Sequence, residues 1–134
     1  MNYDRLEKTA DLLDKVPEQA FEMDVWRACS VEFPFDGTFE CGFAGCAVGW
    51  VIHTGLFPEF TFNVNGVPRY QEGHEVRENW PAVQKLYGLS SAQAGSIFSG
   101  DEYDVSADHV SPRMVADRIR HVVRQERMKR ILEE

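Results

Sequence analysis

The chain has 134 residues, 43% hydrophobic and 12% aromatic, which is enough to bury one hydrophobic core without disulfides or a structural metal. Its net charge of −8 is unevenly distributed, because residues 1–112 hold 18 acidic and 7 basic side chains whereas residues 113–134 hold 4 and 7. This composition excludes an intrinsically disordered chain, and the acidic body disfavours non-specific binding to nucleic acid.

The N-terminal residues predict a helix. Its apolar positions at helical spacing are Tyr3, Leu6, Ala10, Leu13 and Val16. Pro17 ends the pattern, and a loop is expected over residues 30–40. Bulky anchors of a short second helix or turn between them are Phe21, Met23 and Trp26. Because the N-terminus is too charged for a signal peptide and three is an odd number of cysteines, we expect reduced thiols in a cytoplasmic protein.

Residues 41–54 predict a central buried helix. No formal charge occurs between positions 41 and 58, but this run is shorter than the roughly 20 apolar residues of a membrane span. A glycine and a proline also interrupt it. Glycine inside a helix costs about 0.5–1 kcal/mol relative to alanine, so Gly45 and Gly49 indicate close approach by a neighbouring element.

A β-hairpin is expected over about residues 60–70. The alternating apolar residues of its first arm are Phe60, Phe62 and Val64. Asn65-Gly66 is typical of a two-residue turn, and Pro68 predicts that the second arm is an edge strand. Because two strands alone are marginal, the hairpin must pack on a helix.

Three further helices are expected. Residues 74–90 show helical spacing that ends at Gly88, and Ser90 with Gln93 forms a capping box for the next helix. An acidic loop follows, and Ser111-Pro112 starts the last helix. The residues expected to bury its first half are Val115, Ile119 and Val122. The sequence therefore predicts one mostly α domain over residues 1–134, a helical bundle around the central helix with one hairpin.

Cys41 is a candidate nucleophile, because a thiol at a helix N-terminus is favoured as the thiolate. Loop geometry leaves His74 as the plausible base. The residues around Cys41 resemble the nucleophile segment of NlpC-type cell-wall peptidases, which implies a cysteine hydrolase. In that family the histidine lies on a strand of a multi-stranded sheet, whereas one hairpin is expected here. The alternative is that the cysteines are buried and inert.

No metal or cofactor site is predicted. Cys46 and His53 share a helix face but are seven positions apart, and zinc requires four convergent ligands. The acidic residues 101–108 do not match a calcium loop. Neither a dinucleotide-binding glycine pattern nor a phosphate-binding loop occurs.

The basic C-terminal helix is the main candidate for partner recognition. The candidate partner-binding residues are Arg120, Arg124, Arg127, Met128, Lys129, Arg130, Ile131 and Leu132 in this helix, with Val64 and Val67 at the hairpin tip. The expected partner is another protein or a second copy through the same helix, with residues 126–134 either frayed or in contact with it. The alternative is a solvated face that complements the acidic body.

Three landmarks resemble a family of small bacterial and phage proteins to which no chemistry is assigned. The first is a short N-terminal helix ending at Val16-Pro17 with Phe21-x-Met23-x-x-Trp26 after it. The others are the segment Cys41-Gly-x-Ala-x-Cys46-x-x-Gly49-Trp50 and the segment Tyr87-Gly-Leu-Ser-x-x-Gln93-Ala. The family has a small hydroxylated residue in place of Phe43. The resemblance implies a non-enzymatic binding protein of a phage or mobile element, acting in the host cytoplasm and inhibiting a host defence or nucleic-acid-binding complex. A structural or assembly subunit is the remaining alternative.

Overall fold

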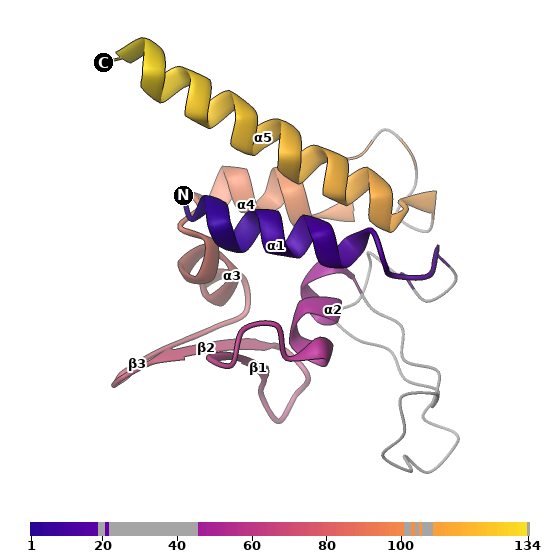
Figure 1. Cartoon of the computed structure of the whole chain (residues 1–134). Helices are drawn as coiled ribbons and strands as arrows, with labels where there is room; N and C mark the ends of the chain where they lie inside the picture. Colours follow the sequence, from indigo (N-terminus) through magenta and orange to yellow (C-terminus); the bar gives the residue numbers. More distant parts are fainter. Residues whose placement is uncertain (19–20, 22–45, 101–102, 104, 106–108, 134) are drawn as a thin grey trace.

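The computed structural model describes residues 1–18, 21, 46–100, 103, 105 and 109–133 (Figure 1). In these ranges the helices are α1 (Tyr3–Leu13), α2 (Ala47–Thr54), α3 (Trp80–Tyr87), α4 (Ser91–Phe98) and α5 (Pro112–Glu133). The strands are β1 (Phe60–Phe62), β2 (Pro68–Glu72) and β3 (Glu75–Glu78). The predicted class, a mostly helical protein with a small antiparallel sheet, is confirmed.

Helix α1 lies between α5 and the part of the fold that holds α2, α3 and the sheet. In Figure 1, α5 crosses the top, α1 runs beneath it in the opposite direction, and α2, α3 and the sheet lie below. As predicted, α1 buries Leu6, Ala10 and Leu13. Its polar Thr9 is also fully buried, and the Thr9 hydroxyl lies 2.7 Å from the Tyr87 hydroxyl of α3. This buried hydrogen bond and the apolar face fix α1 against the lower half of the fold.

Helix α2 is buried over Ala47–Ile52, as expected of the central helix, but it is shorter than predicted. Cys46 has an extended backbone and acts as the N-cap, because its sulfur accepts a hydrogen bond from the Gly49 N–H at 3.5 Å. The prediction that this helix begins at Cys41 is therefore wrong. Residues 41–45, including Gly45, lie outside the described ranges.

The sheet has the order β1-β2-β3, with both pairs antiparallel. The predicted two-residue turn is wrong, because the Asn63 N–H bonds to the Val67 carbonyl at 2.8 Å and encloses three residues. Asn63 also accepts the N–H groups of Asn65 and Val67 with its side chain, and Gly66 has a φ of 77°. This local hydrogen bonding favours the longer loop.

Strand β2 is central, so the prediction that Pro68 marks an edge strand is wrong. Pro68 is the first residue of β2, a position where a missing N–H is tolerated, and its carbonyl accepts the Asn79 N–H at 2.8 Å. The predicted helix over residues 74–90 is also wrong in its first third, which forms β3. A turn with Gly73 at a φ of 60° joins β2 to β3, and Asn79 at 63° separates β3 from α3.

The remaining helix signals are confirmed. Gly88 ends α3 in the left-handed conformation, and Ser90 with Gln93 forms both bonds of the capping box on α4. The Ser111 hydroxyl accepts the Met114 N–H at 3.1 Å at the start of α5. The first half of α5 buries Val115 and Ile119 as predicted, with Val123 rather than Val122 as the next fully buried residue.

Candidate functional site

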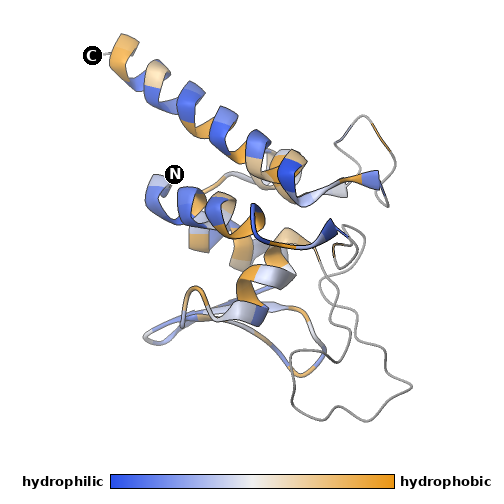
Figure 2. Ribbon diagram, turned by 45° about the vertical axis from the view of Figure 1, so that its right-hand side comes forward, coloured by the Kyte–Doolittle hydropathy of each residue, from blue (hydrophilic) through white to orange (hydrophobic). Residues whose placement is uncertain are grey.

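The two halves of helix α5 differ in how deeply their apolar side chains are buried. Its first half packs into the core through Val115, Ile119 and Val123. In its last turns Met128, Ile131 and Leu132 are 57%, 69% and 82% exposed. Figure 1 shows this end of α5 diverging from α1, and Figure 2 shows apolar residues at its tip. The structure thus leaves the candidate apolar residues of α5 in solvent.

These three side chains form one stripe, which we call the α5 outer face: Met128, Ile131 and Leu132. They are spaced i, i+3 and i+4, so they lie side by side on the helix. Met128 is nine positions after the buried Ile119, which at about 100° per residue places it on the opposite side of the helix. The outer face therefore points away from the protein's own core.

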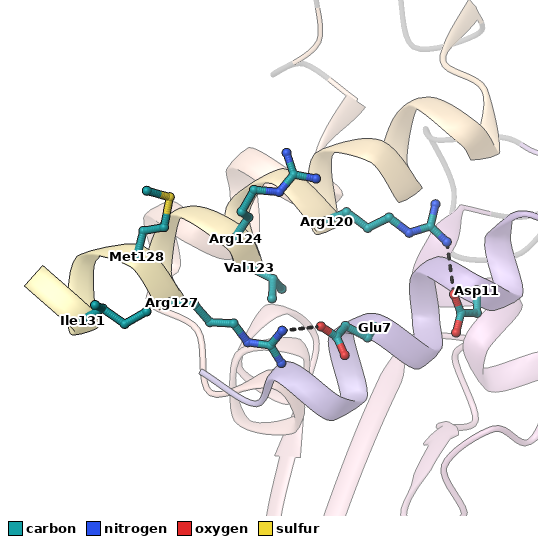
Figure 3. A pocket seen from close by; sticks show the side chains of 8 residues that line it. All are labelled: Glu7, Asp11, Arg120, Val123, Arg124, Arg127, Met128 and Ile131. Atoms are coloured by element: carbon teal, nitrogen blue, oxygen red, sulfur yellow. Dashed lines mark hydrogen bonds and ion pairs between the residues drawn. The ribbon is translucent and has the colours of Figure 1, made fainter.

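Ion pairs hold the inner side of α5 to α1. Arg120 lies 3.1 Å from Asp11 and 2.6 Å from Asp14, and Arg127 lies 2.9 Å from Glu7 (Figure 3). The hydrogen bond from Arg120 lowers the pKa of Asp14 below its ordinary value, and the same bond raises the pKa of Arg120. Two of the candidate partner-binding arginines thus already have counter-charges within the chain.

Tyr3 supports the same contact nearer the tip of α5. The guanidinium of Arg127 lies 4.9 Å from the centre of the Tyr3 ring, and that of Arg130 lies 5.5 Å from it. Both distances are in the range of a cation–π contact. Arg130 is therefore held by an aromatic face, and no carboxylate of the described residues pairs with it.

A groove of about 440 Å³ lies between α1 and the distal half of α5. Its lining residues are Glu7, Asp11, Arg120, Val123, Arg124, Arg127, Met128 and Ile131. In Figure 3, Arg120 and Arg127 reach towards α1, whereas Arg124 and Met128 point away from it. The groove and the outer face are therefore continuous through Met128 and Ile131.

The other basic candidates differ from Arg120 and Arg127. In the part of the chain that the structure describes, Arg124 and Lys129 make no hydrogen bond or ion pair. Glu7, Asp11 and Tyr3 were not identified from the sequence as part of this region. The available signal was the spacing of acidic residues along α1, which matches the spacing of arginines on α5.

The hairpin tip is a separate region. Val64 is 99% exposed, and Val67 is half-buried, in the loop between β1 and β2. Figure 1 places this loop at the opposite end of the molecule from α5. The structure therefore does not join Val64 and Val67 to the α5 residues in one site.

The candidate catalytic pair is not assembled by the described residues. Cys41 lies outside them, and His74 is exposed in the turn between β2 and β3. The thiol at the start of α2 belongs instead to Cys46, where burial raises the pKa to about 11 and outweighs the backbone hydrogen bond from Gly49. Burial also lowers the pKa of His53, which meets the Trp50 ring edge-on. Cys46 is thus a buried, protonated thiol, as the inert alternative predicted.

Neither a metal cluster nor a membrane-spanning helix is found among the described residues. No group of three or more His, Cys, Asp or Glu side chains that could hold a metal ion occurs among them. None of the described helices is both long and apolar enough to cross a membrane. No protein-family model, curated protein or solved structure matches the chain. The family resemblance of the three sequence landmarks therefore stays a prediction.

Proposed function

We propose that the protein is a non-enzymatic binding protein that docks on another protein through the α5 outer face. The observation that carries this proposal is the contiguous exposure of Met128, Ile131 and Leu132 on a helix that is otherwise anchored in the core. Scattered exposed apolar residues are normal, but a stripe rimmed by charges is typical of an interaction surface. A helical face with this spacing matches the helix-and-groove mode of protein recognition.

Covering the outer face contributes a limited free energy of binding. The exposed fractions of its three side chains amount to about two whole side chains, so covering them stabilises a complex by about 3–6 kcal/mol. Association itself costs at least about 4 kcal/mol. The apolar stripe alone therefore gives weak binding, and the partner must also make favourable contacts with the surrounding charges.

A nucleic-acid partner fits less well. Tight binding to a duplex requires several cations on phosphates, but Arg120 and Arg127 are already paired with carboxylates of α1. The centre of the surface is apolar, and the whole chain carries −8. The surface of a protein partner can cover the apolar stripe and also pair with the charged residues around it.

The family resemblance supplies the proposed biological setting. It supports a phage or mobile-element protein that acts in the host cytoplasm, where occupying a surface of a host complex would inhibit that complex. This setting rests on the sequence landmarks, and the docking proposal does not depend on it.

Site-specific photo-crosslinking tests the proposal. A photoreactive phenylalanine analogue replaces Leu132 in one variant and Val64, the exposed apolar residue at the far end, in a control. In lysate of the source cell, position 132 should give a discrete protein adduct that Met128→Asp abolishes. The same adducts at both positions, or none at position 132, would refute the proposal. An adduct between two copies of the chain would refute it in favour of an assembly subunit.

A further inference from the structure

We infer that the segment which docks on the α5 outer face is an acidic amphipathic helix of the partner. This inference rests on the proposed function and specifies the chemistry of the partner. It follows from the cations around the outer face that have no carboxylate partner among the residues the structure describes.

The distal half of α5 holds an excess of positive charge. Arg127 is paired with Glu7, and Arg130 stacks on Tyr3 without a carboxylate. Arg124 and Lys129 make no hydrogen bond or ion pair in the described part of the chain. Arg124, Lys129 and Arg130 thus lack a carboxylate partner within the described ranges. Of these, Arg124 and Lys129 lie beside the apolar stripe, whereas Arg130 lies on the side of α5 that faces Tyr3.

The positions of these cations define the shape of the complement. At about 100° per residue, Arg124 lies in line with the Met128–Leu132 stripe, one turn before Met128. Arg127 lies along one edge of the stripe, and Lys129 lies along the other. An apolar stripe with cations on both edges is complementary to a helix that has an apolar stripe with carboxylates on both edges. Such a helix covers the apolar residues and supplies the missing counter-charges together.

The adjoining groove supports the same occupant. Its volume of about 440 Å³ falls in the range of about 300–1,000 Å³ of binding pockets, so large side chains of a docked helix can enter beside Met128 and Ile131. The carboxylates in its wall, Glu7 and Asp11, are each paired with an arginine. They therefore repel an acidic helix much less than free carboxylates would.

Three other occupants fit these observations less well. A second copy docked through the same face would bring the same unpaired cations against Arg124 and Lys129. An anionic membrane surface would meet only three exposed apolar side chains, because the opposite face of α5 is packed in the core as far as Val123. A nucleic acid would leave the apolar stripe uncovered.

Fluorescence anisotropy with two synthetic peptides tests the inference on the full chain. Both peptides are amphipathic helices of about 20 residues with the same leucine stripe, flanked by glutamate in one and by lysine in the other. The glutamate peptide should bind at least tenfold more tightly than the lysine peptide, and added salt should weaken it. Arg124→Glu combined with Lys129→Glu should abolish or reverse this preference.

Arg113→Glu combined with Lys15→Glu is the matched control, because it makes the same total charge change at two exposed positions away from the distal half of α5. This control should keep the preference, and all variants should keep the far-UV circular dichroism and melting temperature of the wild type. Met128→Asp should weaken both peptides at least tenfold.

Equal binding of the two peptides, or no binding of either, would overturn the inference. The protein-docking proposal would still stand if position 132 gave its specific adduct, so the two failures are distinguishable. Tighter binding to phosphatidylserine vesicles or to duplex DNA than to the glutamate peptide would assign the face to a membrane or a nucleic acid. A stable dimer in sedimentation that Met128→Asp dissolves would assign it to a second copy. Each of these results excludes the acidic helix as the occupant.

Discussion

Helix α5 contains a matched pair of isoleucines that tests the distinction between its two halves. Ile119 is fully buried and Ile131 is 69% exposed, and both lie on the same helix. Ile119→Ala and Ile131→Ala therefore make the same chemical change in opposite environments. The two variants also gain the same helix propensity, about 0.4 kcal/mol, which cancels in the comparison.

The expected magnitudes follow from burial. Ile119→Ala removes methyl groups from a packed core and should cost about 2–5 kcal/mol. At Ile131 only about a third of the side chain is covered, so the lost burial is below about 1 kcal/mol and the propensity gain offsets part of it. The difference should be at least about 1.5 kcal/mol, or about 5 °C or more in melting temperature.

Urea denaturation followed by far-UV circular dichroism measures this difference. The midpoint should fall for Ile119→Ala and stay near the wild-type value for Ile131→Ala, with the slope m unchanged in both. A loss above about 1.5 kcal/mol for Ile131→Ala would show that the distal half of α5 is packed. That result would remove the observation on which the docking proposal rests.

Three further predictions concern other parts of the fold. The first uses a variant that keeps Cys46 as its one cysteine. Because burial raises the pKa of this thiol to about 11, iodoacetamide at about pH 8 should label the native protein at least about 100-fold more slowly than the urea-unfolded protein. Equal labelling rates would contradict this prediction. Because Arg120 lowers the pKa of Asp14 in the fold, the pair stabilises above the unfolded-state pKa and loses this contribution as pH falls through the folded-state pKa. Asp14→Asn should therefore cost up to about 1 kcal/mol at neutral pH and nothing at about pH 2, and an unchanged pH dependence of urea stability would count against the pair. Gly88→Ala should destabilise the protein by at least about 1 kcal/mol more than Gly55→Ala in thermal melts. Both glycines have a φ near 70°, but an added Cβ at Gly88 meets the N-terminal backbone at 3.2 Å, whereas one at Gly55 meets nothing within 4 Å. Equal losses would show that the N-terminal backbone moves aside to accommodate the Cβ.

The helix ends were predicted correctly from the sequence because their signals are local. The capping box of Ser90 and Gln93, the left-handed stop at Gly88 and the Ser111 cap involve residues within a few positions of one another. Hydrogen bonds of this kind form whatever the rest of the chain does. The candidate residues of α5 followed from spacing and charge in the same way.

The errors concern segments whose structure depends on distant residues. Residues 75–78 fit a helix by spacing, yet they form β3 because β2 offers a strand to pair with. The start of α2 carried no strong signal, since a buried cysteine is an unusual N-cap. Pro68 was assigned to an edge because the third strand had not been recognised.

The sequence by itself determined that this is a helical protein with a basic, partly apolar last helix. It could not decide which of the basic residues were available to a partner. That depended on α1, which runs antiparallel to α5 and places Glu7 and Asp11 against Arg127 and Arg120. The outer face is uncovered because it lies on the side of α5 opposite to the buried Ile119. The matching spacing of acidic residues on α1 and arginines on α5 does not say that the two helices are neighbours. The tertiary structure alone therefore separated the paired arginines from the cations that have no carboxylate partner among the described residues.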